Sequence, residues 1–427
     1  MERLSPPTRS SVAQAVIGSG ITFGAIVLLV ASNVAIPLDY VARPVAAGLV
    51  GGVLIGVASA WLGRYALLAA VVLSILLAFP ALWPWAAGLV VVELLIAVVA
   101  RGRTSTPLPI GRFSIAAIAA LLAVGAIRLL PLLPDYASAP EGAAWDGPPV
   151  YLVLLDGYPR IDTLAGLGID NGAFVAELER RGFDHYDDAT SAHQWTHRTL
   201  QALVAGSPDG IPDVPGSTEE QSRIRLELDL PGFLAIDSPA GHVTFRGGDH
   251  WSAGGINDFE AHLLGASALG MVAPGFTANV VGDSLRGHFE GSLELIAAAE
   301  ADRVFAHLIA PHPPFLYAGG VSPCWPGCDI FDVSAETLGI SVEEWADRMR
   351  AHLPAVNERV LRMIDDVLAK RPDAVIVLFG DHGARYGHDA AELHRPFLAA
   401  RTPQRADLFA AEPHPHAILR LVTEAYP

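Results

Sequence analysis

Two stretches, Val150-Tyr-Leu-Val-Leu-Leu-Asp156-Gly-Tyr and Ala374-Val-Ile-Val-Leu-Phe-Gly-Asp381-His382-Gly, decide the fold of this 427-residue chain. Each is a short apolar run rich in branched residues, which is typical of a strand buried on both faces of a parallel sheet. Each run ends at a carboxylate that lies next to glycine. Residues just past the carboxyl ends of such strands line the ligand crevice of an open α/β sheet, so we expect Asp156, Asp381 and His382 to meet at one edge.

Two carboxylates and a histidine at one sheet edge form a ligand set that suits Zn²⁺, Mn²⁺ or Mg²⁺. For either aspartate alone, the alternative is an N-cap of the helix that follows the strand. The combination of Asp156, Asp381 and His382 favours a metal site. The expected cofactor is therefore a divalent metal ion.

Charge is distributed unevenly along the chain. Residues 1–135 contain eight arginines and four acidic residues, whereas residues 136–427 contain 20 basic and 41 acidic residues. Nucleic-acid binding needs a basic footprint, so the acidic part argues against a nucleic-acid partner. We predict a transmembrane domain at 1–135, a linker at 136–148 and an extracytoplasmic catalytic domain at 149–427.

Five apolar segments in the first 135 residues approach the length of about 20 residues that crosses a bilayer. The third and fourth are short and form a re-entrant pair in an alternative topology, while the first is interpreted as a retained anchor because further spans follow it. Arginines lie in alternate loops, which places residues 136–427 outside the cytoplasm of a multi-pass cell-membrane protein. The predicted spans are 12–32, 42–62, 65–82, 85–100 and 113–133.

A candidate nucleophile lies in the segment 191–206. Leu200, Leu203 and Val204 have helical spacing, and Gly206 is a suitable helix stop. Thr196 then lies at or just before a helix amino terminus, where free backbone N–H groups stabilise an alkoxide or bind an anion. Thr196 alone would be interpreted as an N-cap, but a hydroxyl there beside a metal is a candidate nucleophile for phosphoryl transfer.

Other histidines follow predicted strands. His312 comes after the strand at 303–310 and is a candidate catalytic group that binds phosphoryl oxygens or protonates the leaving group; a loop residue fixed by its flanking prolines is the alternative. His394 is a candidate for substrate binding, a second metal position or an acid. His250 and Trp251 follow an expected strand at 242–246 and are predicted to line the substrate pocket, although a partly buried Trp with a satisfied His fits equally. His307 lies inside its strand and is assigned to the core.

The chain has two cysteines, Cys324 and Cys328. Their C-x₃-C spacing differs from the redox C-x-x-C motif, and no further cysteines exist to complete a zinc ribbon. Outside the cytoplasm, a small loop disulfide is the expected state of this pair.

Together these residues resemble the alkaline phosphatase superfamily, specifically its sulfatase-like branch with membrane-anchored phosphoglycerol and phosphoethanolamine transferases. The likeness covers about residues 149–427, and the multi-span amino-terminal part suits those transferases. The stretches that carry it are Leu155-Asp156-Gly157-Tyr158, similar to the first ligand strand; Thr196 to Gly206, similar to the nucleophile helix; Gly380-Asp381-His382-Gly383, the Asp-His-Gly ligand motif; Pro311-His312-Pro313, the Pro-His-x-Pro turn; and Leu393-His394, similar to a later histidine.

The sequence departs from the family pattern at four positions. Sulfatases carry Cys or Ser in a Cys/Ser-x-Pro-x-Arg motif for conversion to formylglycine, whereas this chain has Thr196, Arg198 and Leu200 at those positions. A threonine cannot form formylglycine, so sulfate-ester hydrolysis by that route is not expected. The first ligand is Asp156, where several lipid-head-group transferases have Glu.

The resemblance implies an α/β fold with a mostly parallel sheet sandwiched by helices, and a membrane-anchored, metal-dependent phosphotransferase. Asp156, Asp381, His382 and the Thr196 oxygen would hold the metal, and Thr196 would attack a phosphodiester of a membrane lipid or envelope polymer. A phosphodiesterase or sulfatase-like hydrolase would use the same residues. A catalytically inactive envelope-assembly scaffold would be expected to have lost at least one of them. The oligomeric state stays open.

Overall fold

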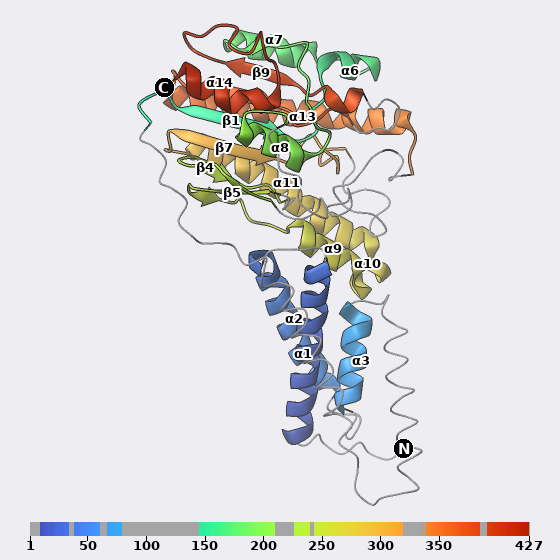
Figure 1. Cartoon of the computed structure of the whole chain (residues 1–427). Helices are drawn as coiled ribbons and strands as arrows, with labels where there is room; N and C mark the ends of the chain where they lie inside the picture. The colour runs from blue at the N-terminus through green and yellow to red at the C-terminus, as the bar shows by residue number, and fades with distance from the viewer. Residues whose placement is uncertain are drawn as a thin grey trace, which may run out of the picture. The chain divides into compact units, whose positions relative to one another are not determined.

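The computed structural model describes residues 9–33, 38–59, 66–78, 145–209, 226–239, 243–318, 335, 339–384 and 391–426. The chain divides into two compact units (Figure 1). One comprises Met1–Asp135 together with Phe259–Thr277, and the other comprises Tyr136–Asp258 and Ala278–Pro427. The first unit therefore includes a segment from the middle of the chain.

Apolar helices form the first unit. Where α1 and α2 cross, a Cβ on Gly52 would lie 2.8 Å from the Gly20 Cα, so only small residues permit this approach. A buried hydrogen bond of 2.7 Å between the hydroxyls of Ser19 and Ser74 joins α1 to α3. Close contacts at small residues and hydrogen bonds between hydroxyls are typical of helix packing in membranes. The helices are α1 (Arg9–Asn33), α2 (Leu38–Ser59) and α3 (Ala66–Ala78), with α9 (Asp258–Ala266) and α10 (Ala268–Val272) from the later segment.

One described helical segment, Ala42–Ser59, is long and apolar enough to cross a membrane by length and composition, and Val12–Val27 is apolar but shorter. Helix α3 covers part of the predicted span at 65–82. The predicted spans at 85–100 and 113–133 lie outside the described residues, as do both cysteines. The five-span topology therefore stays a prediction.

A seven-stranded sheet in the order β2-β9-β8-β1-β7-β4-β6 forms the centre of the second unit. Strand β1 pairs in parallel with β7 on one side and with β8 on the other, while β9 is antiparallel to β8 and β2. The predicted mostly parallel α/β sheet with flanking helices is confirmed. The strands are β1 (Val150–Leu155), β2 (Asp184–His185), β4 (Leu234–Ile236), β6 (His250–Trp251), β7 (Arg303–Leu308), β8 (Val375–Phe379) and β9 (Leu398–Arg401).

Helices cover both faces of this sheet, so every residue of β1 and β8 is buried (Figure 1). Helices α8 and α14 pack on one face, and α7 and α13 contact each other on the opposite face. The helices are α6 (Ile161–Gly166), α7 (Gly172–Arg180), α8 (Thr196–Ala205), α11 (Pro274–Ala298), α13 (Val342–Lys370) and α14 (Ile418–Ala425), with 3₁₀ turns η5 (Glu392–His394) and η6 (Pro415–Ala417).

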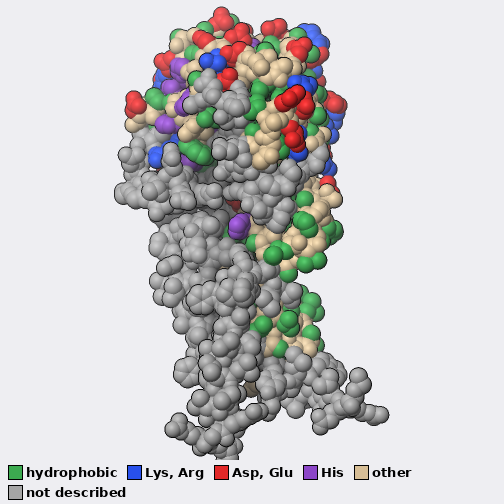
Figure 2. Space-filling view, turned by 90° about the vertical axis from the view of Figure 1, so that its right-hand side faces the viewer, with side chains coloured by type: hydrophobic (Ala, Val, Ile, Leu, Met, Phe, Trp, Pro, Cys, Tyr) green, Lys and Arg blue, Asp and Glu red, His purple; other side chains and the backbone are tan. Residues whose placement is uncertain are grey.

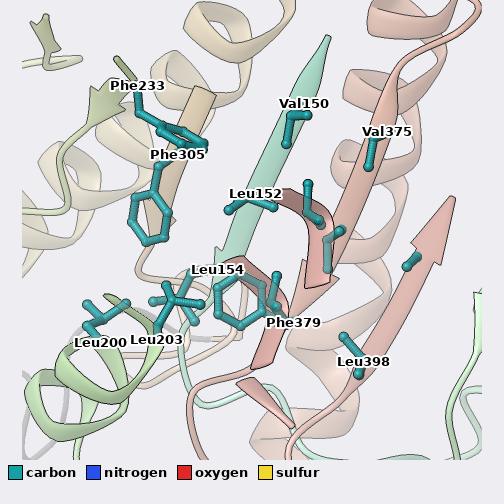
Figure 3. Close-up of a cluster of buried hydrophobic side chains, with 14 of the residues drawn as sticks. Val150, Leu152, Leu154, Leu200, Leu203, Phe233, Phe305, Val375, Phe379 and Leu398 are labelled. Carbon is teal, nitrogen blue, oxygen red and sulfur yellow. The ribbon is translucent and has the colours of Figure 1, made fainter. Parts of the chain in front are cut away.

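The hydrophobic core fixes α8 against the central strands. Figure 3 shows Leu200 and Leu203 of α8 beside Leu154 of β1 and Phe379 of β8, and all four belong to one buried cluster. Burying a leucine side chain contributes roughly 1.5–3 kcal/mol. These two leucines therefore hold the start of α8 at the end of the sheet where the predicted ligands lie.

Two predicted elements differ from the structure. The sequence predicts a helix from Val356 to Lys370. In the structure this helix begins at Val342, where the Ser341 hydroxyl accepts the Glu344 N–H at 3.1 Å as an N-cap, and it continues through Pro354. The strand expected to lead into His250 is β5 (Val243–Arg246), which pairs with β3 (Leu226–Asp229) in a separate two-stranded sheet. His250 and Trp251 therefore form the edge strand β6 themselves and do not follow a strand of the main sheet.

Helix α13 carries a histidine with no exposed surface, His352. Its Nδ1 accepts a hydrogen bond of 3.1 Å from the Tyr317 backbone N–H, and its ring stacks on the Tyr317 ring at a centroid distance of 5.5 Å. Burial lowers the pKa of His352 from 6.5 to about 3. The side chain therefore stays neutral in the folded protein at pH values where the unfolded chain protonates it.

We expect His352 to make the fold sensitive to acid. The unfolded chain binds a proton below about pH 6.5 that the folded chain does not, so stability falls with pH by about 1.4 kcal/mol per unit until the folded pKa is approached. The thermal midpoint of the full chain in detergent, measured at pH 7.5 and pH 5, should decrease more in the wild type than in His352→Gln. Equal decreases would contradict this role.

Candidate active site

Asp156, Asp381 and His382 meet where the adjacent strands β1 and β8 end. Their exposed fractions are 3%, 0% and 1%. His382 Nε2 lies 3.6 Å from Asp156 Oδ1 and 3.6 Å from Asp381 Oδ2. All three of these atoms are buried without a hydrogen-bond partner in the described part of the chain.

The second polar atom of each side chain is held by a hydrogen bond. His382 Nδ1 lies 2.7 Å from the Gly383 carbonyl oxygen, which only accepts, so Nδ1 carries the proton and Nε2 a lone pair. The Gly157 N–H donates to Asp381 Oδ1 at 2.9 Å. His307 Nε2 donates to Asp156 Oδ2 at 2.9 Å. These hydrogen bonds hold the three side chains so that their unsatisfied atoms, Asp156 Oδ1, Asp381 Oδ2 and His382 Nε2, lie close together.

The residues present fit a divalent cation. Two carboxylate oxygens and an imidazole lone pair face one another without a proton between them, and buried negative groups need a compensating positive charge. Ligands about 2.0–2.2 Å from a tetrahedral Zn²⁺ lie about 3.4 Å apart, close to the two spacings of 3.6 Å found here.

His312 extends this cluster. One ligand atom from each of Asp156, His312 and His382 lies within 4.8 Å of the others. His312 Nδ1 lies 2.6 Å from the Pro313 carbonyl oxygen and therefore carries the proton, so Nε2 is the nitrogen with a lone pair. The His312 backbone N–H donates to the Asp156 carbonyl at 2.9 Å, which ties the turn after β7 to the end of β1. The predicted catalytic histidine thus lies among the residues that could hold a metal ion.

Gly157 makes room for both histidines. Its φ of 62° is a left-handed conformation, and a Cβ there would lie 3.1 Å from His312 Cδ2 and 3.2 Å from His382 Cε1. Any side chain at this position would strain the backbone and displace the rings. The glycine after the first carboxylate is therefore part of the site.

Asp156 is ionised at neutral pH despite its burial. Burial by itself would raise the pKa of this carboxyl group. The nearby His312, the hydrogen bond from His307 and the adjacent His382 ring outweigh that effect and hold the pKa of Asp156 well below its usual range. An ionised, buried carboxylate is the form that a cation binds.

Thr196 is the first residue of α8 and is 8% exposed. Trp195 before it is extended, with φ −116° and ψ 131°, and Gly206 ends the helix in the left-handed conformation, so the predicted helix is confirmed. One turn further on, the Thr199 hydroxyl donates to the Asp381 carbonyl at 3.1 Å and lies 3.3 Å from the Ser191 hydroxyl. This contact brings the amino-terminal turn of α8 against the loop that carries the ligands.

The remaining residues that the sequence predicts for the site are His394, His250 and Trp251. His394 is bound to the loop before α8, because its Nδ1 donates to the Ser191 carbonyl at 2.8 Å and its carbonyl accepts the Ser191 N–H at 2.9 Å. His250 and Trp251 are exposed on the edge strand β6. Strand β6 is three positions from β1, or roughly 14 Å along the sheet at about 4.8 Å per strand.

His307 is a candidate site residue that the sequence alone did not reveal. It lies in β7 opposite Leu154 of β1 and is 5% exposed, so an assignment to the core fits its burial. The structure shows that its ring reaches Asp156 Oδ2. The sequence does contain a signal for this role, because a histidine buried in an apolar strand needs a polar partner. The apolar neighbours of His307 in the strand are Val304, Phe305, Ala306 and Leu308.

No family model matches the sequence, and no curated protein matches it. The solved structures to which it is similar include phosphoethanolamine transferases and a sulfatase. They include the C-terminal periplasmic domain of EcEptC from Escherichia coli in complex with Zn (13% identity, 68% of this chain and 86% of that chain, TM-score 0.37). They also include the integral membrane lipooligosaccharide phosphoethanolamine transferase A from Neisseria meningitidis (13%, 94% and 77%, 0.33) and BT1596, a 2-O GAG sulfatase (13%, 65% and 70%, 0.40).

Asp156→Ala and Asp381→Ala should each abolish or severely weaken the binding of a divalent metal ion, because removing a charged ligand leaves the cation under-coordinated. Metal content and Zn²⁺ affinity of the purified full chain are the measurements. Asp283→Ala is the control, since its side chain is 72% exposed on α11. Full metal occupancy in both site variants would refute the ligand assignment.

His307→Ala should lower metal affinity by about 10- to 100-fold, the usual effect of losing a group that orients a ligand. His307→Gln should recover part of this loss, because its amide can still donate to Asp156. Zn²⁺ titration of the two folded variants measures the difference. Wild-type affinity in His307→Ala would show that Asp156 needs no orienting partner.

Proposed function

We propose that this chain is a membrane-anchored, metal-dependent phosphotransferase that acts on a phosphodiester of a membrane lipid or envelope polymer. The observation that supports it most is the convergence of Asp156 Oδ1, Asp381 Oδ2 and His382 Nε2, three buried and unsatisfied atoms at the carboxyl ends of β1 and β8. Hydrolytic and transfer enzymes use such clusters of hard ligands to bind phosphoryl oxygens through a metal.

Thr196 is the proposed nucleophile. Its place at the first position of α8 gives it the unpaired backbone N–H groups and positive end of a helix dipole, both of which favour a negative oxygen. A divalent cation held by Asp156, Asp381 and His382 would lower the pKa of the Thr196 hydroxyl and neutralise phosphoryl charge. The Thr196 oxygen then forms a bond to phosphorus while the bond to the leaving oxygen breaks, and water or an acceptor hydroxyl later displaces Thr196.

His312 is suited to the leaving-group side of this reaction. In its protonated form, Nε2 can donate a proton to the departing oxygen, while Nδ1 stays bonded to the Pro313 carbonyl. His394 is proposed to contact substrate from the loop before α8, to which it is hydrogen-bonded. His250 and Trp251 are proposed to contact a part of a large substrate that lies farther from the Asp156, Asp381 and His382 cluster. That part would extend along the side of the sheet where the parallel strands end.

The proposed membrane topology is based on the composition of the chain. Residues 1–135 would anchor the protein through several membrane spans, with Ala42–Ser59 as the described helix that meets the length and hydropathy for one. Residues 136–148 would link this anchor to an acidic catalytic domain at 149–427 outside the cytoplasm.

Thr196→Ala should eliminate turnover of a phospholipid donor and leave metal binding largely intact, because three ligands remain. Thr199→Ala is the matched control one turn along α8. It removes a hydrogen bond to the Asp381 carbonyl, worth roughly 1 kcal/mol, and should keep substantial activity.

Mass spectrometry after incubation with phospholipid should find the transferred phosphoryl group, still esterified to one alcohol of the donor, on Thr196 and none on Thr199 or Ser191. The fate of the phosphoryl group distinguishes the two activities. A transferase passes it to an added acceptor, whereas a phosphodiesterase releases it into water. Near-normal turnover by Thr196→Ala would rule out the covalent mechanism.

A further inference from the structure

An exposed apolar patch lies on the segment from the middle of the chain that belongs to the first unit. Residues 263–282 contain no Asp, Glu, Lys, Arg or His over 20 positions. Within them, Leu269, Met271, Val272 and Phe276 are 47%, 61%, 85% and 59% exposed. Large apolar side chains grouped on an otherwise uncharged surface mark a contact with a protein or a membrane. Figure 2 shows hydrophobic side chains gathered on the described surface of this unit.

The local fold presents these side chains outward on ordered backbone. The Ser267 hydroxyl accepts the Gly270 N–H at 3.2 Å and caps α10. A Cβ on Gly270 would lie 2.6 Å from the Leu264 carbonyl oxygen, so α10 packs closely on the end of α9. Helix α11 begins at once with Pro274, a preferred first residue of a helix. The patch thus lies on α10 and the first turn of α11.

Contacts inside the first unit indicate what covers this patch. Helix α10 packs against α3. In addition, Arg43 at the amino end of the span Ala42–Ser59 forms an ion pair of 2.8 Å with Glu260 of α9. A charged pair at the end of a span marks the level at which the helix leaves the hydrocarbon region. Helix α2 exposes apolar residues of the same kind along the span, among them Val50 and Leu54, which are 65% and 67% exposed.

We propose that Leu269, Met271, Val272 and Phe276 insert into the lipid surface of the membrane that α2 crosses. Apolar side chains on an interfacial helix bury roughly 5–10 Å into the boundary between head groups and acyl chains. The segment lies between β6 and β7 in the sequence, so it ties the sheet to the bilayer at a second point besides the linker at 136–148. This inference rests on the proposed membrane anchoring and is independent of the phosphotransfer chemistry.

Fluorophore quenching by lipid tests the insertion. In a Cys324→Ser, Cys328→Ser background, single cysteines replace Val272, Leu54 or Asp187 and carry an environment-sensitive NBD label. The full chain is reconstituted into phosphatidylcholine vesicles that contain lipid with doxyl groups on the acyl chain. Leu54 reports the span, and Asp187, whose side chain is 86% exposed in the second unit, reports a water-facing site of similar exposure to Val272.

We expect doxyl lipid to quench the labels at residues 272 and 54 several-fold more than the label at residue 187. Quenching at 54 without quenching at 272 would overturn the insertion and leave the membrane anchor standing. Absence of quenching at both positions would overturn the anchor as well. If the unlabelled Val272→Cys protein instead forms a disulfide-linked dimer, the patch is covered by a second copy of the chain and the lipid assignment is wrong.

Discussion

Electrostatic repulsion among three buried electron-pair donors is the constraint around which this site is built. Asp156 Oδ1 and Asp381 Oδ2 each lie 3.6 Å from His382 Nε2, and none of these three buried atoms has a hydrogen-bond partner among the described residues. Charges in a low-dielectric interior interact strongly, so such a cluster is stable only when a cation compensates it. Metal binding and the stability of this sheet edge are therefore expected to be coupled.

The surrounding structure supplies the rigidity that this arrangement needs. Strands β1 and β8 are buried along their whole length and paired directly, so their ends cannot separate without exposing the core. His307, from the neighbouring strand on the other side of β1, fixes the Asp156 carboxylate. Leu200 and Leu203 hold α8 against the same core, so the helix that begins with Thr196 shares one rigid frame with the ligands.

A lipid or membrane-polymer substrate would explain why the same chain combines a polar candidate active site with so apolar a first unit. The first unit combines close glycine contacts, buried hydroxyl hydrogen bonds and outward-facing apolar residues, three features of helices packed in lipid. The patch around Val272 adds an apolar surface from a segment whose flanking strands, β6 and β7, belong to the seven-stranded sheet.

Local pattern in the sequence was enough to predict β1, β8 and α8, because buried strands and an amphipathic helix each leave a short periodic signal. It also predicted that Asp156, Asp381 and His382 converge, because parallel strands end at a common edge. Tertiary structure alone decided that His307 bonds to Asp156, that His250 and Trp251 form an edge strand, and that residues 259–277 join the helices of the first unit. Strand order and side-chain partners depend on contacts between residues far apart in the chain, which periodicity within a single segment does not encode.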